Sequence, residues 1–264
     1  MRSRSTHEPR LNLLVRTVLA LAFFASQARA AGVAQSLYQS GQYGQAVAAA
    51  VAENTAEGFA LAAHATLADA MMRPPCLSCL KRAEDFARKA VAIDPKLAEG
   101  HVYLALSLGY QARIVGILRA RLGDYPGQAR QNLDAALASD PANAQALAAL
   151  GGWNIEIVRG GGALLADWLY GASVKAGLGD FAAAFRAAPE NVVLRYQYAL
   201  SLGGFDLAAY RGEVEDALTR SVNGTASTAY DAFAQSRARE LLAALKKNDA
   251  AGFARLVRRD QGYP

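Results

Sequence analysis

The two cysteines of the chain are the residues whose type and spacing point most directly to chemistry. Cys76 and Cys79 lie three positions apart, and an amphipathic segment begins directly after them. Such a pair can be a redox centre, half of a metal site, a haem anchor or a disulfide. Leu80 follows the second cysteine, whereas haem attachment needs a histidine there. A zinc site needs two more ligands, and His64 and His101 are not at ligand spacing.

We favour a disulfide between Cys76 and Cys79, because the N-terminus of the chain indicates export into an oxidising space. A thioredoxin-like centre would need a preceding strand in a βαβ unit, and no strand pattern occurs there. A redox or partner-linked role stays the alternative. A bridge across so short a loop would stabilise the fold by about 1 to 2 kcal/mol. It would fix the start of the helix that follows Pro74 and Pro75.

Residues 1–30 have the three parts of a secretory signal peptide. An arginine-rich start precedes an apolar stretch at 17–25 (TVLALAFFA) and a small-x-small sequence at 28–30 (Ala-Arg-Ala). The apolar stretch is much shorter than the roughly 20 residues that cross a bilayer. An uncleaved anchor or an amphipathic first helix is the alternative. Cleavage would leave residues 31–264 as the mature chain, in the periplasm or secreted.

Removal of this segment changes the charge of the chain. The full sequence has 28 basic and 23 acidic residues, and residues 1–30 hold five Arg and one Glu. The mature chain therefore has 23 basic and 22 acidic residues, which gives no electrostatic basis for binding nucleic acid. No later stretch is long and apolar enough to span a membrane. We expect a single all-α domain over residues 31–264.

Three segments of the chain align on a proline, at Pro95, Pro141 and Pro189, which lie 46 and 48 residues apart. The sequence ALSLG occurs at 105–109 and again at 199–203, at the same distance after its proline. Apolar positions before Pro95 follow a helical period, and the proline ends the helix. Self-similarity of this kind indicates stacked helix pairs, each of which buries its apolar face against the next.

These units resemble the tetratricopeptide repeat family over residues 33–205. The family's large-then-small pair in the first helix is matched by Leu104-Ala105, Leu150-Gly151 and Tyr198-Ala199. Its second-helix pattern is matched by Ala83, Ala87, Ala90 and Pro95, by Ala129, Leu133, Ala136 and Pro141, by Phe181, Ala184 and Pro189, and near the N-terminus by Gly41, Tyr43 and Ala46. The resemblance implies a solenoid of antiparallel helix pairs whose first helices line a concave surface.

The spacing of the units exceeds the family's repeat of about 34 residues by 12 and 14 residues. The extra residues fall inside the units, at about 110–124 and 156–178, which predicts lengthened helices with inserted turns. The repeats would cover residues 31–205, and residues 206–264 would form a helical cap. Its helices are expected near 209–220, 228–246 and 249–259, with breaks at Asn223-Gly224 and Asn248-Asp249.

The sequence contains no group of side chains that indicates catalysis. The glycine run in RGGGALLADW (159–168) is not followed by the Gly-Lys-Ser/Thr of a phosphate-binding loop, so we interpret it as a break between helices. No G-x-S-x-G elbow or comparable setting for a nucleophile occurs. We therefore expect no enzyme, no cofactor and no metal site.

Aromatic residues gather in and around the second insertion, at Trp153, Trp168, Tyr170, Tyr196 and Tyr198. Two interpretations stay open. The rings fill the space left by the irregular repeat, or they form a pocket or a binding hot spot. Together with the positions that the resemblance places on the concave surface, the candidate binding residues are Glu99, Tyr110, Gln145, Glu156, Arg159, Trp168 and Tyr196.

The function expected from these features is binding without catalysis. The first hypothesis is a periplasmic scaffold or adaptor for a protein or peptide partner in the cell envelope. The second is a small-ligand-binding accessory component of periplasmic solute transport, as some helical-repeat proteins resembling this one are. Self-association stays open under both. An open groove lined by Glu, Gln and Tyr would favour the first hypothesis, and a closed aromatic cavity of about 300 Å³ or more would favour the second.

Overall fold

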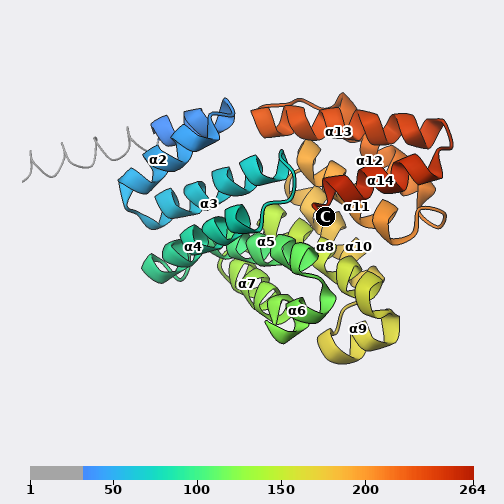
Figure 1. Ribbon diagram of the computed structural model, residues 1–264, viewed down its shortest axis with the longest axis horizontal. Helices are drawn as coiled ribbons and strands as arrows, with labels where there is room; N and C mark the ends of the chain where they lie inside the picture. Colours follow the sequence, from blue (N-terminus) through green and yellow to red (C-terminus); the bar gives the residue numbers. More distant parts are fainter. Residues whose placement is uncertain (1–31) are drawn as a thin grey trace, which may run out of the picture.

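Every regular element is an α-helix in the part of the chain that the structure describes, residues 32–264 of a computed structural model (Figure 1). The predicted all-α class is confirmed, and the expected signal peptide at 1–30 lies outside the described residues. None of the described helices has the length and apolar character needed to cross a bilayer. After a helical segment over 32–39, the helices are α2 (Tyr43–Glu53), α3 (Ala56–Met71), α4 (Leu77–Ile93), α5 (Ala98–Val115), α6 (Ile117–Leu122), α7 (Tyr125–Ser139), α8 (Ala144–Gly161), α9 (Ala163–Tyr170), α10 (Val174–Ala187), α11 (Val192–Asp206), α12 (Arg211–Asn223), α13 (Ala229–Lys246) and α14 (Ala250–Asp260).

Helices that are neighbours in the chain pack as pairs. α3 packs on α4, α5 on α7, α8 on α10 and α11 on α12. Three of the second helices end just before the aligned prolines, at Ile93, Ser139 and Ala187. α8 and α10 approach each other closely, because a Cβ on Gly151 would lie 2.9 Å from the carbonyl oxygen of Gly177. The small residue at this position is therefore required by the packing of the pair.

The two insertions are built alike. In each, the chain turns at a glycine with positive φ, Gly116 at 82° or Gly162 at 76°, a conformation that side-chain-bearing residues rarely adopt. The helices before them, α5 and α8, are lengthened to 18 residues each, as the sequence predicts. The sequence predicts turns in the insertions. Each insertion also forms a short helix, α6 in the first and α9 in the second. The stretches ILRARL and ALLADWLY contain no interior glycine or proline that would prevent helix formation.

The array of helices curls until its two ends meet (Figure 1). Ala229, at the start of α13, faces Gly41 in the turn before α2, where an added Cβ would lie 2.8 Å from the Ala229 Cβ. The next residue, Tyr230, packs against the core of the N-terminal half. The helices expected after residue 206 are present as α12, α13 and α14, and α13 closes the array. The inner faces of the helices therefore surround a central space.

The predicted disulfide between Cys76 and Cys79 is present. Cys76 is also the residue that caps the N-terminus of α4, and its sulfur accepts a hydrogen bond from the Cys79 N–H at 3.2 Å. The bridge and the cap act on the same helical turn. Together they define where α4 begins after Pro74 and Pro75.

Candidate functional site

A cavity of about 510 Å³ lies inside the curled array. Its wall is formed by the first helices of the central pairs, by the short helices α6 and α9, by α13 and by the segment after α14. Most of the side chains that face it are apolar, including those of Leu67, Ile117, Leu133, Trp153 and Leu165. The volume lies within the range of pockets that hold small molecules, about 300 to 1,000 Å³.

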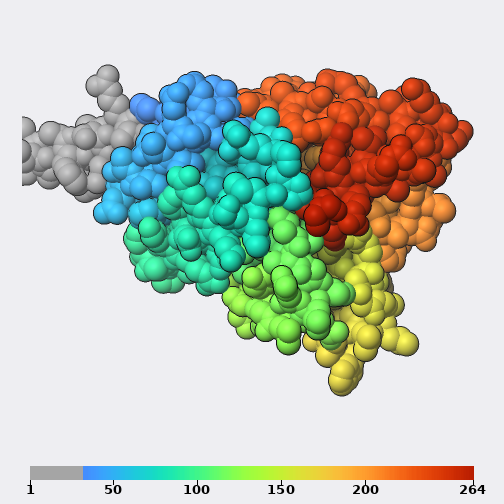
Figure 2. All heavy atoms as spheres, viewed as in Figure 1, coloured from blue at the N-terminus to red at the C-terminus, as the bar shows by residue number. Residues whose placement is uncertain are grey.

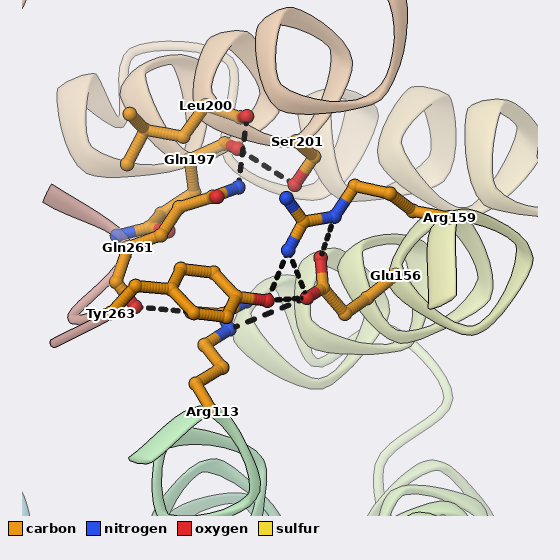
Figure 3. A network of polar contacts seen from close by, with 8 residues as sticks. All are labelled: Arg113, Glu156, Arg159, Gln197, Leu200, Ser201, Gln261 and Tyr263. Carbon is orange, nitrogen blue, oxygen red and sulfur yellow. Dashed lines mark hydrogen bonds and ion pairs between the residues drawn. The ribbon is translucent and has the colours of Figure 1, made fainter. Parts of the chain in front are cut away.

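One part of the wall is a charged network that ties α5 and α8 to the C-terminal segment (Figure 3). Arg159 binds Glu156 twice, from Nη2 to Oε1 at 2.5 Å and from Nε to Oε2 at 3.1 Å. The Tyr263 hydroxyl donates to Glu156 and accepts from Arg159. Arg113 lies with its Nε 3.8 Å from Glu156 Oε1 and donates to the backbone carbonyl of Gln261 at 3.0 Å. The Glu156 carboxylate therefore connects α5, α8 and the C-terminal segment.

The wall carries more positive than negative charge. Among its residues, Arg113, Arg121 and Arg159 are cations and Glu156 is the one carboxylate. Burial would raise the pKa of Glu156, but the guanidinium groups of Arg113 and Arg159 outweigh it and hold the pKa below its usual value. Burial and the charge of Glu156 raise the pKa of Tyr263 to about 12. At neutral pH the network therefore consists of ionised arginines, one carboxylate and a neutral phenol.

His64 on α3 is a second polar group on the wall, and it lies between two tyrosines. The Tyr38 hydroxyl is 2.7 Å from Nε2, and the Tyr103 hydroxyl is 2.9 Å from Nδ1. The Tyr103 hydroxyl also lies 3.4 Å from Gln145 Oε1. Burial lowers the pKa of His64 to about 4. The imidazole is therefore neutral at physiological pH and adds no charge to the cavity.

Two more tyrosine side chains line the wall. They belong to Tyr110 on α5 and Tyr230 on α13, and burial raises the pKa of both. The guanidinium of Arg113 lies 5.1 Å from the centre of the Tyr110 ring. Both side chains are therefore neutral phenols at physiological pH.

Four of the seven binding residues predicted from the sequence line the cavity, namely Tyr110, Gln145, Glu156 and Arg159. The other three lie elsewhere. Glu99 is exposed at the start of α5, and the Trp168 side chain on α9 is 80% exposed. Tyr196 on α11 is 2% exposed and belongs to the core. Placing Tyr196 on the inner surface was wrong, because α13 and α14 pack on α11 and bury it.

The aromatic residues near the second insertion divide between the two interpretations. Trp153 and Tyr170 line the cavity, where their rings meet edge to face with centres 6.0 Å apart. The Trp153 indole N–H donates to the Pro126 carbonyl at 3.0 Å, which holds the ring in place. Tyr198 packs in the core of the C-terminal half, next to Phe181. Some rings thus fill space between helices, while others form the cavity wall.

Sequence reasoning missed several polar residues of the site, which are His64, Arg113, Tyr230 and Tyr263. Arg113 could have been predicted from the sequence, because it lies one turn after Tyr110 on the same helix and shares the inner face of that helix. No sequence pattern around the other three residues indicates that they belong to the site. Tyr263 meets Glu156 from a position 107 residues further along the chain.

An apolar surface lies outside the cavity on α6 and α9. These two helices project at the lower edge of the molecule in Figure 2, in green and yellow. Exposed fractions there range from 41% to 89%. The α6/α9 patch consists of Ile117, Leu118, Leu122, Leu164, Leu165, Trp168 and Leu169. Ile117, Leu165 and Leu169 also line the cavity, so the patch continues into it.

No protein-family model matches the chain, and a search of curated proteins found no match. Within residues 32–264, no three His, Cys, Asp or Glu side chains gather where a metal ion could bind. The chemistry that the cavity offers is an apolar wall, an excess of guanidinium groups and a few uncharged hydrogen-bonding groups.

Proposed function

We propose that the chain is a binding protein whose cavity holds one small molecule with a largely apolar body, and that it catalyses no reaction. The cavity of about 510 Å³ with its mainly apolar wall carries this proposal. An apolar ligand gains free energy by leaving water for such a space. The few polar groups on the wall would orient the ligand. A cavity of this size with a mainly apolar wall favours this function over the scaffold that we considered first.

Binding without chemistry is supported by the state of the polar groups. Glu156 is ion-paired and its pKa is lowered, which makes it a weak base. His64 is hydrogen-bonded at both ring nitrogens, and its pKa of about 4 makes it a weak base as well. General acid–base catalysis works best with a group whose pKa lies near the ambient pH. Neither residue meets this condition.

We further propose that the protein works in the periplasm as a tetratricopeptide-like accessory component of solute transport. The support is the signal pattern at 1–30, the bridge between Cys76 and Cys79, and the pairs of helices around a cavity. N-terminal sequencing of the native protein should start at Ala31. A native protein that retains Met1 would refute cleavage.

Filling the cavity tests its role directly, and Gly109 is the place to fill it. This residue of α5 lines the cavity, and a Cβ at its position would meet no atom within 4 Å. Gly109→Phe should therefore place a ring in the cavity without disturbing the backbone. Gly179→Phe on α10 is the matched control, because a Cβ there also meets no atom within 4 Å and the residue is exposed, away from the cavity. Both changes replace a helical glycine by a better helix former.

N-phenylnaphthylamine, an uncharged apolar dye that fluoresces when it leaves water, is the probe for this comparison. The wild-type protein and Gly179→Phe should bind it alike. Gly109→Phe should bind it at least about tenfold more weakly, a difference of about 1.4 kcal/mol. Circular dichroism confirms that all three proteins are folded. Equal binding by all three would refute the cavity as the binding site.

The α6/α9 patch supports a second candidate function, the scaffold for a protein or peptide partner. Its apolar side chains are 41% to 89% exposed, and a surface of this kind is typical of interaction sites on soluble proteins. Leu164 is 89% exposed, so Leu164→Glu should remove the patch's apolar character without affecting the fold. A partner captured from envelope extract by the wild-type protein and by Gly109→Phe, but not by Leu164→Glu, would support the scaffold. A partner lost with both variants would link it to the filled cavity instead.

A further inference from the structure

We infer that the ligand of the cavity is an amphipathic anion, with an apolar body and one oxyanion head group of the carboxylate class. The inference rests on the proposed function and specifies the ligand of that same cavity. Its basis is the imbalance of charge on the wall, which holds three arginines, Arg113, Arg121 and Arg159, and the single carboxylate of Glu156. An anionic head group would reduce this imbalance.

Arg113 is the guanidinium with the weaker hold on the shared carboxylate. Its Nε lies 3.8 Å from Glu156 Oε1, whereas Arg159 Nη2 lies 2.5 Å from the same oxygen. Arg159 also donates a hydrogen bond to Glu156 Oε2, so both carboxylate oxygens already bind Arg159. The Arg113 side chain is 20% exposed and is therefore largely removed from water. A cation in this position is stabilised by a further anion.

Tyr110 lies beside Arg113 and suits a carboxylate as a second donor. Its ring centre is 5.1 Å from the guanidinium, and both residues line the cavity. A guanidinium fork and a phenol donor can supply charge-assisted hydrogen bonds to an oxyanion. A cationic head group would instead meet three arginines. The apolar body would then lie against Ile117, Leu165 and the other apolar residues of the wall.

A series of head groups on one apolar chain tests this inference. Dodecanoate, dodecanol and dodecylamine share the chain and differ in charge, and each can displace N-phenylnaphthylamine. Dodecanoate should bind the wild-type protein at least about tenfold more tightly than dodecanol, and dodecylamine should bind most weakly. This comparison needs no variant, so it decides the ligand class even where a substitution prevents folding.

Two variants locate the head group. Arg113→Gln should bring the affinity ratio of dodecanoate to dodecanol close to one, while the affinity for dodecanol stays within about twofold. Arg73→Gln, two residues after the end of α3, is the control, because that side chain is 67% exposed, pairs with Asp69 and does not line the cavity. Its ratio should equal that of the wild-type protein.

The outcomes distinguish the proposed binding function from the proposed anionic ligand. Failure of the dye and all three ligands to bind would refute the proposed function itself. Equal binding of dodecanoate and dodecanol, or tighter binding of dodecylamine, would leave the cavity as a binding site and overturn the anionic ligand. A preference for dodecanoate that survives Arg113→Gln would overturn the assignment of the head group to Arg113.

Discussion

Replacing Glu156 with glutamine should lower the free energy of unfolding by about 2 kcal/mol at neutral pH. The change keeps the shape of the side chain and removes the charge that Arg113 and Arg159 share. An exposed ion pair contributes about 0 to 1 kcal/mol, and removing one partner of a fully buried pair costs about 3 to 5 kcal/mol. The side chains of Arg113, Glu156 and Arg159 are 20%, 26% and 29% exposed. The expected loss therefore lies between these limits.

The loss should shrink in acid. The pKa of Glu156 lies below the ordinary value of 4.5, since the two arginines outweigh the effect of burial. Its stabilising contribution is therefore complete above about pH 5 and disappears as the pH falls through the pKa of the folded state. His64 titrates in both proteins, so its effect cancels in the difference between them.

Urea unfolding of the wild-type protein and Glu156→Gln, followed by circular dichroism between pH 7 and pH 3, measures both effects. Asp216→Asn is the control, because the Asp216 and Arg220 side chains are 59% and 60% exposed, and its loss should stay below about 1 kcal/mol. A loss for Glu156→Gln below about 0.5 kcal/mol at pH 7 would refute the role given to the network. A difference that stays constant down to pH 3 would show that the charge of Glu156 is not its cause.

Three further changes test the placement of individual residues. Trp153→Ala should lower the free energy of unfolding by about 3 kcal/mol, because the indole packs on Tyr170 and donates a hydrogen bond to the Pro126 carbonyl. Trp168→Ala should change it by less than about 0.5 kcal/mol, because that side chain is exposed. Equal shifts of the two variants in thermal unfolding would contradict this placement. Cys76→Ser should cost about 1 to 2 kcal/mol and leave binding of N-phenylnaphthylamine unchanged, so lost binding at an unaltered Tm would mean a role beyond structure. The His64 ring should stay neutral down to about pH 5 in an NMR titration, and protonation near its ordinary value of 6.5 would contradict its burial.

Local patterns were sufficient to predict the helices and much of the inner surface. Helices end before Pro95 and Pro141 because a proline restricts the residue that precedes it, an effect that acts between neighbours in the chain. Tyr110, Gln145 and Glu156 were expected on the inner surface from the resemblance to tetratricopeptide repeats, and they line the cavity from α5 and α8. The short helices of the two insertions were not predicted.

The sequence by itself determined the all-helical class, the pairing of neighbouring helices and the bridge between Cys76 and Cys79, since each depends on residues close together in the chain. Only the tertiary structure decided that the array closes, through the contact of Gly41 with Ala229, and that Tyr263 reaches Glu156. Periodicity assigns a side chain to one face of a helix, but the elements that cover this face come from distant parts of the chain. Long-range packing therefore made the inner surface the wall of a cavity.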